Sequence, residues 1–562
     1  MDSGEEFVAD HKAAWAKLWK KDIIIAATAS EDITSVAAGM SVSGSASIAL
    51  DASVHILDVK TRAFIGDDPS DAVASAGAGD VHAEGNILIS ADERTEIDKI
   101  VGVLAVSGTA GIGAAGGVTV IDKTTEAFVG AGAKVTADGK SADAVVKTGA
   151  FAPGVAAQPS YDPNNAGDQG IQTNNLSGVP NDAGALRGQG EVKTPRLSMS
   201  REEDGTNDMT DGSFTGQRTV TDGTKTGFRG LSVTATNKDD IEAFTVSIGG
   251  GIVGVAISAG VNVVDTTTQA TIGQSALVNT DLTTAGTAQS VHVAAGNDFY
   301  HLAVAGTLAA GVVGVAPAVD VTVLSNTTLA TIGPSAVVKA RNDVTVEAHA
   351  REDILLMGFG IAAGTVGIGG AVDVLSIDNR TYASIGAGAQ VSAGGDVLVS
   401  STDDTDVDQI SGALAAGFVG VGASVGVMVI DKDTQAFIDS GAVVDALGAG
   451  TGLTGVLSGL NSGSSFGTTA VHGLVVQAQS NENIFHLAVA GGFGFVGVSG
   501  GVNVTLIDSD TAAFIGPNAQ INQTGGNATL NFPPSVIGAT TATFTVCRAT
   551  PVGKQNRVVT VT

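Results

Sequence analysis

The stretch SVHVAAGNDFYHLAVAGTLAAGVVGVAPAVDVTVLSNTTLATIG, at residues 290–333, is followed by two further versions of itself, each starting 53 residues after the last. These are DVTVEAHAREDILLMGFGIAAGTVGIGGAVDVLSIDNRTYASIG at residues 343–386 and DVLVSSTDDTDVDQISGALAAGFVGVGASVGVMVIDKDTQAFID at residues 396–439. Looser copies, which bring the number of units to seven, begin at Asp22, Asn86, Leu231 and Leu474. Seven copies indicate an array in which each unit buries its apolar face on its neighbours.

The apolar part of each unit alternates with a period of two. In residues 319–323 three valines are separated by Asp320 and Thr322. Alternation of β-branched residues predicts strands. Charge-free runs long enough to span a bilayer do occur, but they are rich in glycine and lack the Lys/Arg asymmetry of membrane helices; they lie at residues 243–264, 302–319 and 411–430. If the alternating valines form the buried face, replacing Val372 or Val374 with aspartate should destabilise the array by several kcal/mol.

We therefore predict an all-β protein, a parallel β-solenoid of about seven 53-residue repeats over residues 22–530. The mixed charged and apolar residues of 1–21 predict a short amphipathic helix that caps the first rung, and residues 531–562 form an atypical C-terminal segment. A unit of 53 residues is long for a narrow β-helix. We therefore expect two to three rungs per unit and a rod roughly 70 to 100 Å long.

Two insertions, at residues 141–229 and 448–473, interrupt the array. Both are rich in small and polar residues and have no apolar period, so we expect them to be long loops projecting from the scaffold. The alternative is a tolerated insertion without function. The larger insertion carries Phe151, Tyr161, Arg187, Arg196 and Phe214. These side chains suit recognition, and we expect this insertion to make the specific contact.

Composition excludes several classes of protein. The net charge of -29 argues against a nucleic-acid partner, which would need clusters of Lys and Arg. A single cysteine, Cys547, excludes an intrachain disulfide framework. Glycine supplies 77 of 562 residues, and charged residues are 15% against roughly 25% in ordinary globular chains. These values favour a repetitive scaffold with a thin core.

Catalytic motifs are absent from the sequence: there is no HExxH, GxSxG or phosphate-binding loop and no metal-spaced Cys/His set. His301 and His486 occupy the same apparent position of the repeat. Other units have Lys99 or Gln409 there, and a position that accepts such different side chains is expected to be exposed at the surface. We expect neither a catalytic residue nor an organic cofactor.

Acidic residues recur after the first strand of each unit, where we expect a polar corner. Stacking would bring these carboxylates together, and Ca²⁺ prefers oxygen ligands. The candidate calcium ligands are Asp403, Asp404, Asp406, Asp239 and Asp240. The alternative is a solvated acidic face. A second line follows the second strand, where we expect Asp turns; it consists of Asp58, Asp122, Asp265, Asp378, Asp431 and Asp508, with Ser325 in the fourth unit.

A glycine-rich apolar stretch, then V-x-V, a spacer and D-x-x-T-x-A-x-I-G occur at residues 261–273 and 372–386. This pattern resembles the repeats of large bacterial filamentous adhesins of the leukotoxin type, over about residues 22–520. The resemblance implies a secreted or surface-attached β-solenoid, exported by a two-partner or autotransporter route. The chain contains neither an export signal nor a membrane anchor that we recognise, so we expect a fragment of a larger exported protein.

The function that we predict is structural: an adhesin stalk or extracellular fibre component without catalytic activity. Its partners would be a host or neighbouring-cell surface, through a glycan or matrix protein. Two alternatives remain at this point. One is a carbohydrate-active β-helix enzyme, a lyase or glycosidase with paired carboxylates along a groove. The other is a self-assembling filament subunit that associates with copies of itself.

Overall fold

The computed structural model describes residues 21–67, 79–155, 218–462, 465–522, 542–549 and 554–561. All regular elements in these ranges are β-strands, which confirms the all-β prediction. Of the capping helix expected at residues 1–21, residues 1–20 lie outside the described residues, so this prediction stays untested. Within the described ranges, no helix has the length and apolar character needed to cross a membrane.

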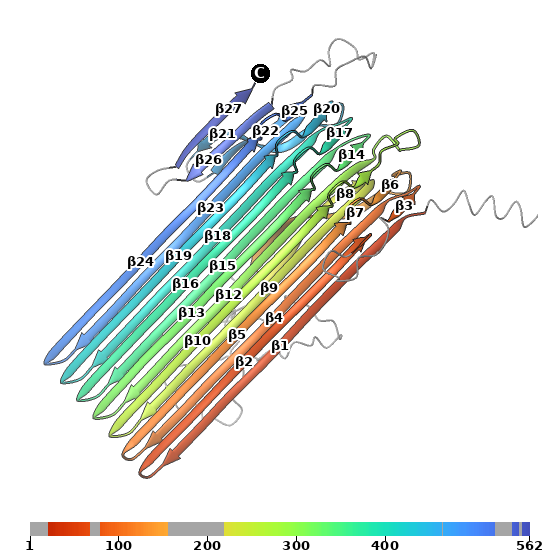
Figure 1. Cartoon of the computed structure of the whole chain (residues 1–562). Helices are drawn as coiled ribbons and strands as arrows, with labels where there is room; N and C mark the ends of the chain where they lie inside the picture. Colours follow the sequence, from red (N-terminus) through yellow and green to blue (C-terminus); the bar gives the residue numbers. More distant parts are fainter. Residues whose placement is uncertain are drawn as a thin grey trace, which may run out of the picture.

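Each of the seven units contributes one long strand to a parallel sheet, sheet A, in chain order (Figure 1). These strands are β1 (Ile23–Ser43), β4 (Ile87–Ser107), β9 (Gly230–Gly250), β12 (Ser290–Ala310), β15 (Val344–Ala363), β18 (Val397–Ala416) and β23 (Leu474–Phe493). Two C-terminal strands extend this sheet: β26 (Ala542–Ala549) pairs with β23 in parallel, and β27 (Lys554–Val561) pairs with β26 in antiparallel fashion.

After a two-residue turn the chain returns in a second parallel sheet, sheet B, again with one strand from each unit. Its strands are β2 (Ala46–Ile65), β5 (Ala110–Val129), β10 (Val253–Ile272), β13 (Val313–Ile332), β16 (Val366–Ile385), β19 (Val419–Ile438) and β24 (Val496–Ile515). Short strands then form sheet C: β3 (Asp80–Ala83), β6 (Lys134–Ala137), β11 (Leu277–Val278), β14 (Val337–Ala340), β17 (Gln390–Ala393), β20 (Val443–Ala446) and β25 (Gln520–Ile521).

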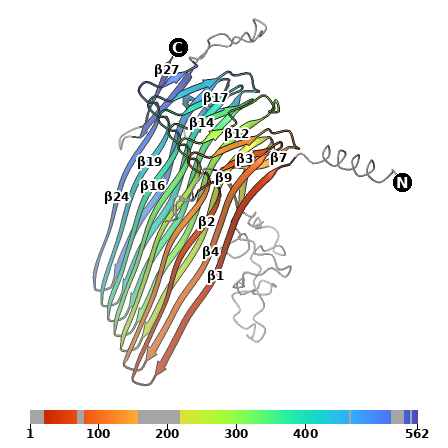
Figure 2. The same ribbon diagram turned by 45° about the vertical axis from the view of Figure 1, so that its right-hand side comes forward.

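The parallel β-solenoid is thus confirmed, but the expected rung count was wrong: one unit is one rung. A strand of 20 residues is about 65 Å long, while seven strands side by side measure only roughly 30 Å. The molecule is therefore a slab whose longest dimension follows the strands (Figures 1 and 2). The two-residue turns lie at one end of the slab, and sheet C closes the other end. Periodicity could not reveal this, because the acidic stretch looked like a corner and is in fact mid-strand.

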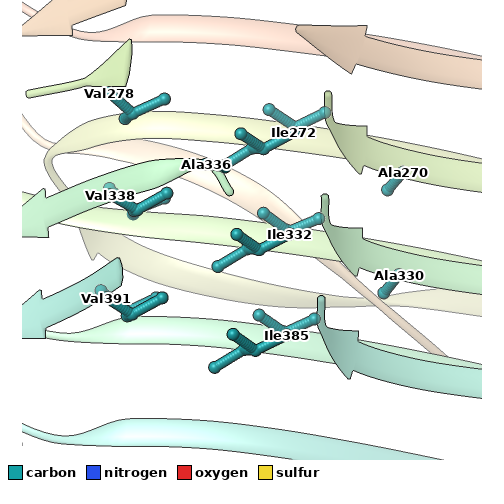
Figure 3. Close-up of a cluster of buried hydrophobic side chains, with 14 of the residues drawn as sticks. Ala270, Ile272, Val278, Ala330, Ile332, Ala336, Val338, Ile385 and Val391 are labelled. Atoms are coloured by element: carbon teal, nitrogen blue, oxygen red, sulfur yellow. The ribbon is translucent and has the colours of Figure 1, made fainter. Parts of the chain in front are cut away.

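The interior near sheet C is a dry apolar core between the three sheets (Figure 3). Ile272, Ile332 and Ile385 stack in one ladder of sheet B, opposite Val338 and Val391 of sheet C. All five are buried. This part follows the sequence pattern, because the closing motif A-x-I, which is A-F-V at residues 127–129, places its alanine and its isoleucine or valine inward.

Close to the turns the two long sheets approach each other so closely that their inward positions hold small residues, mainly glycine and alanine. A Cβ added to Gly360 of sheet A would lie 2.1 Å from the carbonyl oxygen of Gly370 in sheet B. The turns obey the same rule, since a Cβ on Gly364 would lie 2.3 Å from the carbonyl oxygen of Gly311 one rung earlier. Large side chains are therefore absent from the part of the interior closest to these turns.

The alternating valines consequently face outward, and the expectation that they form the buried face was wrong. Val372 is 37% exposed, whereas Asp373 beside it is fully buried. Val374 likewise points away from the interior, and Leu375 points inward. The period of two was correct, but it does not say which of the two faces is covered.

The two insertions contain strands that their composition did not predict. The first begins and ends in an antiparallel pair, β7 (Ala144–Val155) and β8 (Arg218–Phe228), and the second forms β21 (Leu453–Ser462) and β22 (Ser465–Val471). Both pairs have irregular register, which obscures a period of two in the sequence. Of the recognition residues proposed above, Phe151 lies in β7; the other four fall outside the described residues.

Candidate functional site

The acidic stretch lies in the middle of the sheet A strands, so its residues alternate between two faces. Asp239 and Asp403 point into the space between sheets A and B and are fully buried. Asp240, Asp404 and Asp406 are on the outer face of sheet A. The five candidate calcium ligands therefore lie on opposite faces of sheet A. The prediction that they occupy a polar corner was wrong, because they lie within the strands.

On the outer face, carboxylates of neighbouring rungs form columns. Glu96 pairs in register with both Asp32 and Asp240. Burial and the charges of neighbouring carboxylates raise the pKa of Glu96 to about 9. Burial, together with Glu242 and Asp32, raises the pKa of Asp98 to about 7. Among the described residues no group of three or more His, Cys, Asp or Glu side chains could hold a metal ion, and calcium binding stays a hypothesis.

Between the sheets lies a first ion cluster around Lys123, a lysine that is almost completely buried. Its Nζ is 2.5 Å from Asp239 Oδ1 and also contacts Glu93 Oε2. It donates a hydrogen bond of 2.9 Å to Thr95 Oγ1, which in turn donates one of 2.8 Å to Glu93 Oε1. Burial raises the pKa of Glu93 to about 8, although the charge of Lys123 opposes this shift.

A second cluster of the same design surrounds Lys432, four rungs further along. Its Nζ is 2.6 Å from Asp403 Oδ1 and 3.4 Å from Glu482 Oε1. It donates a hydrogen bond of 2.8 Å to Thr405 Oγ1, and this hydroxyl donates one of 2.8 Å to Glu352 Oε2. Burial and the charge of Asp403 raise the pKa of Glu352 to about 8.

A third group of buried polar residues lies nearer the turns. Lys99 Nζ donates to Thr119 Oγ1 at 2.6 Å and to Asn262 Oδ1 at 3.3 Å, and burial lowers its pKa to about 8. His301 donates from Nδ1 to the carbonyl oxygen of Ile241 at 2.9 Å, and burial lowers its pKa to about 4. The prediction that His301 and Lys99 lie at the surface was therefore wrong, because both are fully buried.

His301 and His486 are also not equivalent. In the sheet register His301 stands beside Ile241 and Ile354, whereas His486 stands beside Gln409. The two histidines lie in adjacent inward columns.

The outer face of sheet B carries an apolar band between the turns and the second line of aspartates. Its centre is a ladder of seven outward valines in register: Val54, Val118, Val261, Val321, Val374, Val427 and Val504. In the outward positions of the band on the seven described strands, Ser376 is the one polar residue. The band measures about 40 by 30 Å, on the order of 1,000 Å², larger than the apolar patch of a typical monomer.

The second line of aspartates marks the edge of this band. It is a straight column on the outer face of sheet B, in register from Asp58 to Asp508. The prediction of Asp turns there was wrong, because the column lies within the strands.

On sheet A the outward half near the turns is apolar too, as Leu308, Ile361 and Leu414 show. The turns themselves expose Phe418 and Phe495, which stack with ring centroids 5.0 Å apart.

The β7–β8 hairpin is held on the polar half of sheet A by ion pairs. Asp222 of β8 is 2.5 Å from Lys238 Nζ and 3.0 Å from Lys147 Nζ. Burial alone would raise the pKa of Asp222, but the hydrogen bond from Lys238 and the charge of Lys147 hold it below its usual value. Lys147 also reaches Asp92 of β4 at 2.7 Å.

We expect Asp222→Ala to loosen this hairpin, because Lys238, Lys147 and Arg94 would lose their shared partner. Proteolysis between residues 144 and 228 should become severalfold faster, while the rungs keep their protection. A matched change at the exposed pair of Asp80 with Lys134, 3.5 Å apart, should have no such effect. Equal proteolysis of Asp222→Ala and the parent chain would show that the ion pairs do not hold the hairpin.

Comparisons with known proteins found no matching family model, no matching curated protein and no similar solved structure. The buried lysine clusters were missed by sequence reasoning. The available signal was the lysine at the third position of I-D-K in residues 121–123 and 430–432, two residues before the recurring threonine, in an otherwise lysine-poor repeat.

Proposed function

We propose that this chain is a non-enzymatic structural protein of the adhesin type, whose repeated outer faces make its contacts. The observation that carries the proposal is the apolar band around the seven-valine ladder. It repeats the same surface in every rung, which suits multiple weak attachments better than one specific site. The resemblance to filamentous adhesins, and with it a secreted or cell-surface location in bacteria, belongs to this proposal.

The band also bears on the chemistry of the partner. Glycan recognition needs hydrogen-bonding groups and stacking aromatics, and the outward positions of the band consist of Val, Ile, Leu, Ala, Gly, Pro and Ser376. An apolar surface, such as that of a matrix protein, fits these side chains better. Asp403 and Glu352 lie in one cluster of carboxylates, but both are fully buried and hydrogen-bonded within the slab, so a saccharide cannot reach them. This disfavours the carbohydrate-active alternative at this cluster.

The test replaces Val321, Val374 and Val427 together with threonine, which keeps side-chain shape and strand preference while adding hydroxyls. Beads coated with the parent chain should attach to matrix-coated and alkyl-coated surfaces, and the triple variant should lose at least severalfold in attachment. The control replaces Thr327, Arg380 and Asp433, in the polar half of the same three strands, with alanine. The control should attach like the parent.

Two results would contradict the proposal. One is equal attachment of the triple variant and the parent chain, which would move the contact away from the band. The other is release of reducing or unsaturated sugars when the chain is incubated with a panel of polysaccharides, which would favour the enzyme.

A further inference from the structure

Lys123 and Lys432 sit in the same four-residue arrangement in two different rungs. Each lysine lies against an aspartate, Asp239 or Asp403, on the facing sheet. Each also donates to a threonine hydroxyl that donates in turn to a glutamate. The two relays, Lys123–Thr95–Glu93 and Lys432–Thr405–Glu352, differ in where the glutamate lies. Glu93 is on the same strand as Thr95 and also contacts Lys123 directly, whereas Glu352 lies beside Thr405 on the preceding strand.

Both arrangements are closed to solvent. Lys432 and Lys123 are at most 1% exposed, and their aspartates and glutamates are fully buried. Charges held in such a place have lost their hydration, so the ion pair is costly to maintain. A neutral amide in the same position would not carry this cost.

We propose that each lysine forms an isopeptide bond with its aspartate: Lys432 Nζ with Asp403 Cγ, and Lys123 Nζ with Asp239 Cγ. The amine gives a proton through the threonine hydroxyl to the glutamate and attacks the aspartate carboxyl carbon. A C–N bond forms and a C–O bond breaks, and the leaving oxygen departs as water with protons that came from the amine. No oxidant, nucleotide or metal is consumed, and the net charge of the site is unchanged.

The geometry supplies what this condensation needs. The fold holds amine and carboxylate within hydrogen-bond distance. Such positioning speeds an intramolecular reaction as much as an effective concentration on the order of 10⁵ M or more. The glutamates act as proton carriers. Their raised pKa values, about 8 for both Glu93 and Glu352, lie close to neutral pH, where a proton carrier is most effective.

Lys99 is a control that the chain itself provides. It is as deeply buried as Lys432, but its hydrogen bonds go to the neutral groups of Thr119 and Asn262. We expect its amine to stay free.

The consequence is a covalent tie across the slab. The bond at Lys432 joins β19 of sheet B to β18 of sheet A within one rung, and the bond at Lys123 joins β5 to β9 of the next rung. Such ties would resist separation of the sheets under mechanical load.

The experiment measures the intact mass of the purified, denatured chain. The expected result is the sequence mass less two water molecules. Besides arginines, trypsin cuts only after lysines whose side-chain amine is free, so the unfolded chain should be cut after Lys99 but not after Lys123 or Lys432. A full sequence mass with cleavage after both lysines overturns the proposal.

Two variants separate the sites and keep the shape of each side chain. Glu352→Gln should restore one water mass and cleavage after Lys432, while the bond at Lys123 still forms and reports an intact fold. Glu93→Gln should do the reverse. If Glu352→Gln still lacks cleavage after Lys432, the proton relay through Glu352 is overturned.

Discussion

Replacing Ile385 with aspartate is expected to cost about 4 kcal/mol or more in the free energy of unfolding, because it puts an unpaired charge into a dry core. Ile385 is fully buried between the three sheets, in the ladder with Ile332. Aspartate at Val372, only 13 residues earlier in the same strand, should cost about 1 kcal/mol or less, since that side chain faces outward.

Denaturant unfolding and hydrogen exchange measured rung by rung would check both values. Because an array is stabilised by each unit and its neighbours, Ile385→Asp should lower protection in the fifth rung and the rungs beside it more than in β4 or β5. Ile385→Ala serves as the size control, removing volume without adding charge. Equal costs for Ile385→Asp and Val372→Asp would show that the faces of β16 are not as described.

Stability is expected to fall as pH rises from about 5 to 9, the reverse of the behaviour of proteins whose carboxylates are salt-bridged. Burial raises the pKa of Glu96 to about 9, of Glu352 to about 8 and of Asp320 to about 7. In the unfolded chain these groups ionise near pH 4. Above pH 4 the unfolded chain loses these protons while the folded chain keeps them. The stabilisation present at low pH therefore decreases, and it is lost once the pH exceeds the pKa in the folded state.

Lys99 does not change this sign below pH 8. Burial lowers its pKa to about 8, so the lysine is charged in both states at lower pH and contributes a constant cost there. His301, whose pKa burial lowers to about 4, opposes the loss only up to about pH 6.5. The net loss between pH 5 and 8 should therefore still be on the order of several kcal/mol. Melting temperatures across this range would measure it.

Glu96→Gln tests the origin of this pH dependence. The variant has no proton to lose, so its melting temperature should fall less steeply with pH and should exceed that of the parent at pH 8. Glu84→Gln, which makes the same change at an exposed position, is the control. A parent chain more stable at pH 8 than at pH 5 would contradict the assignment of raised pKa values.

The repeats explain how much could be predicted. Copies at residues 290–333, 343–386 and 396–439 were enough for a parallel β-solenoid of seven units, because self-similar chains can only bury identical apolar faces by stacking. The glycine that ends the repeated pattern has a packing reason: at Gly333 and Gly386 an added Cβ would lie 2.8 Å from backbone of the preceding rung. The turn glycines Gly311 and Gly364, equally constrained, were overlooked among the many glycines nearby.

The candidate sites were harder to predict, because they depend on which residues of different rungs face one another. Asp403 and Asp404 are adjacent in sequence, yet one lies against Lys432 inside the slab and the other is exposed. The partners of Lys123 come from 30 residues before it and 116 after it. No local pattern relates these positions.

By itself, the sequence determined that the protein is an array of strands, since few other folds are compatible with both an apolar period of two and a repeat of 53 residues. Only the tertiary structure decided that each repeat makes one wide rung, and which side of each strand is covered. The physical reason is the spacing of the two long sheets. Where their backbones nearly touch, as at Gly360 and Gly370, only small residues fit between them, and the valines, although the more apolar set, are left outside.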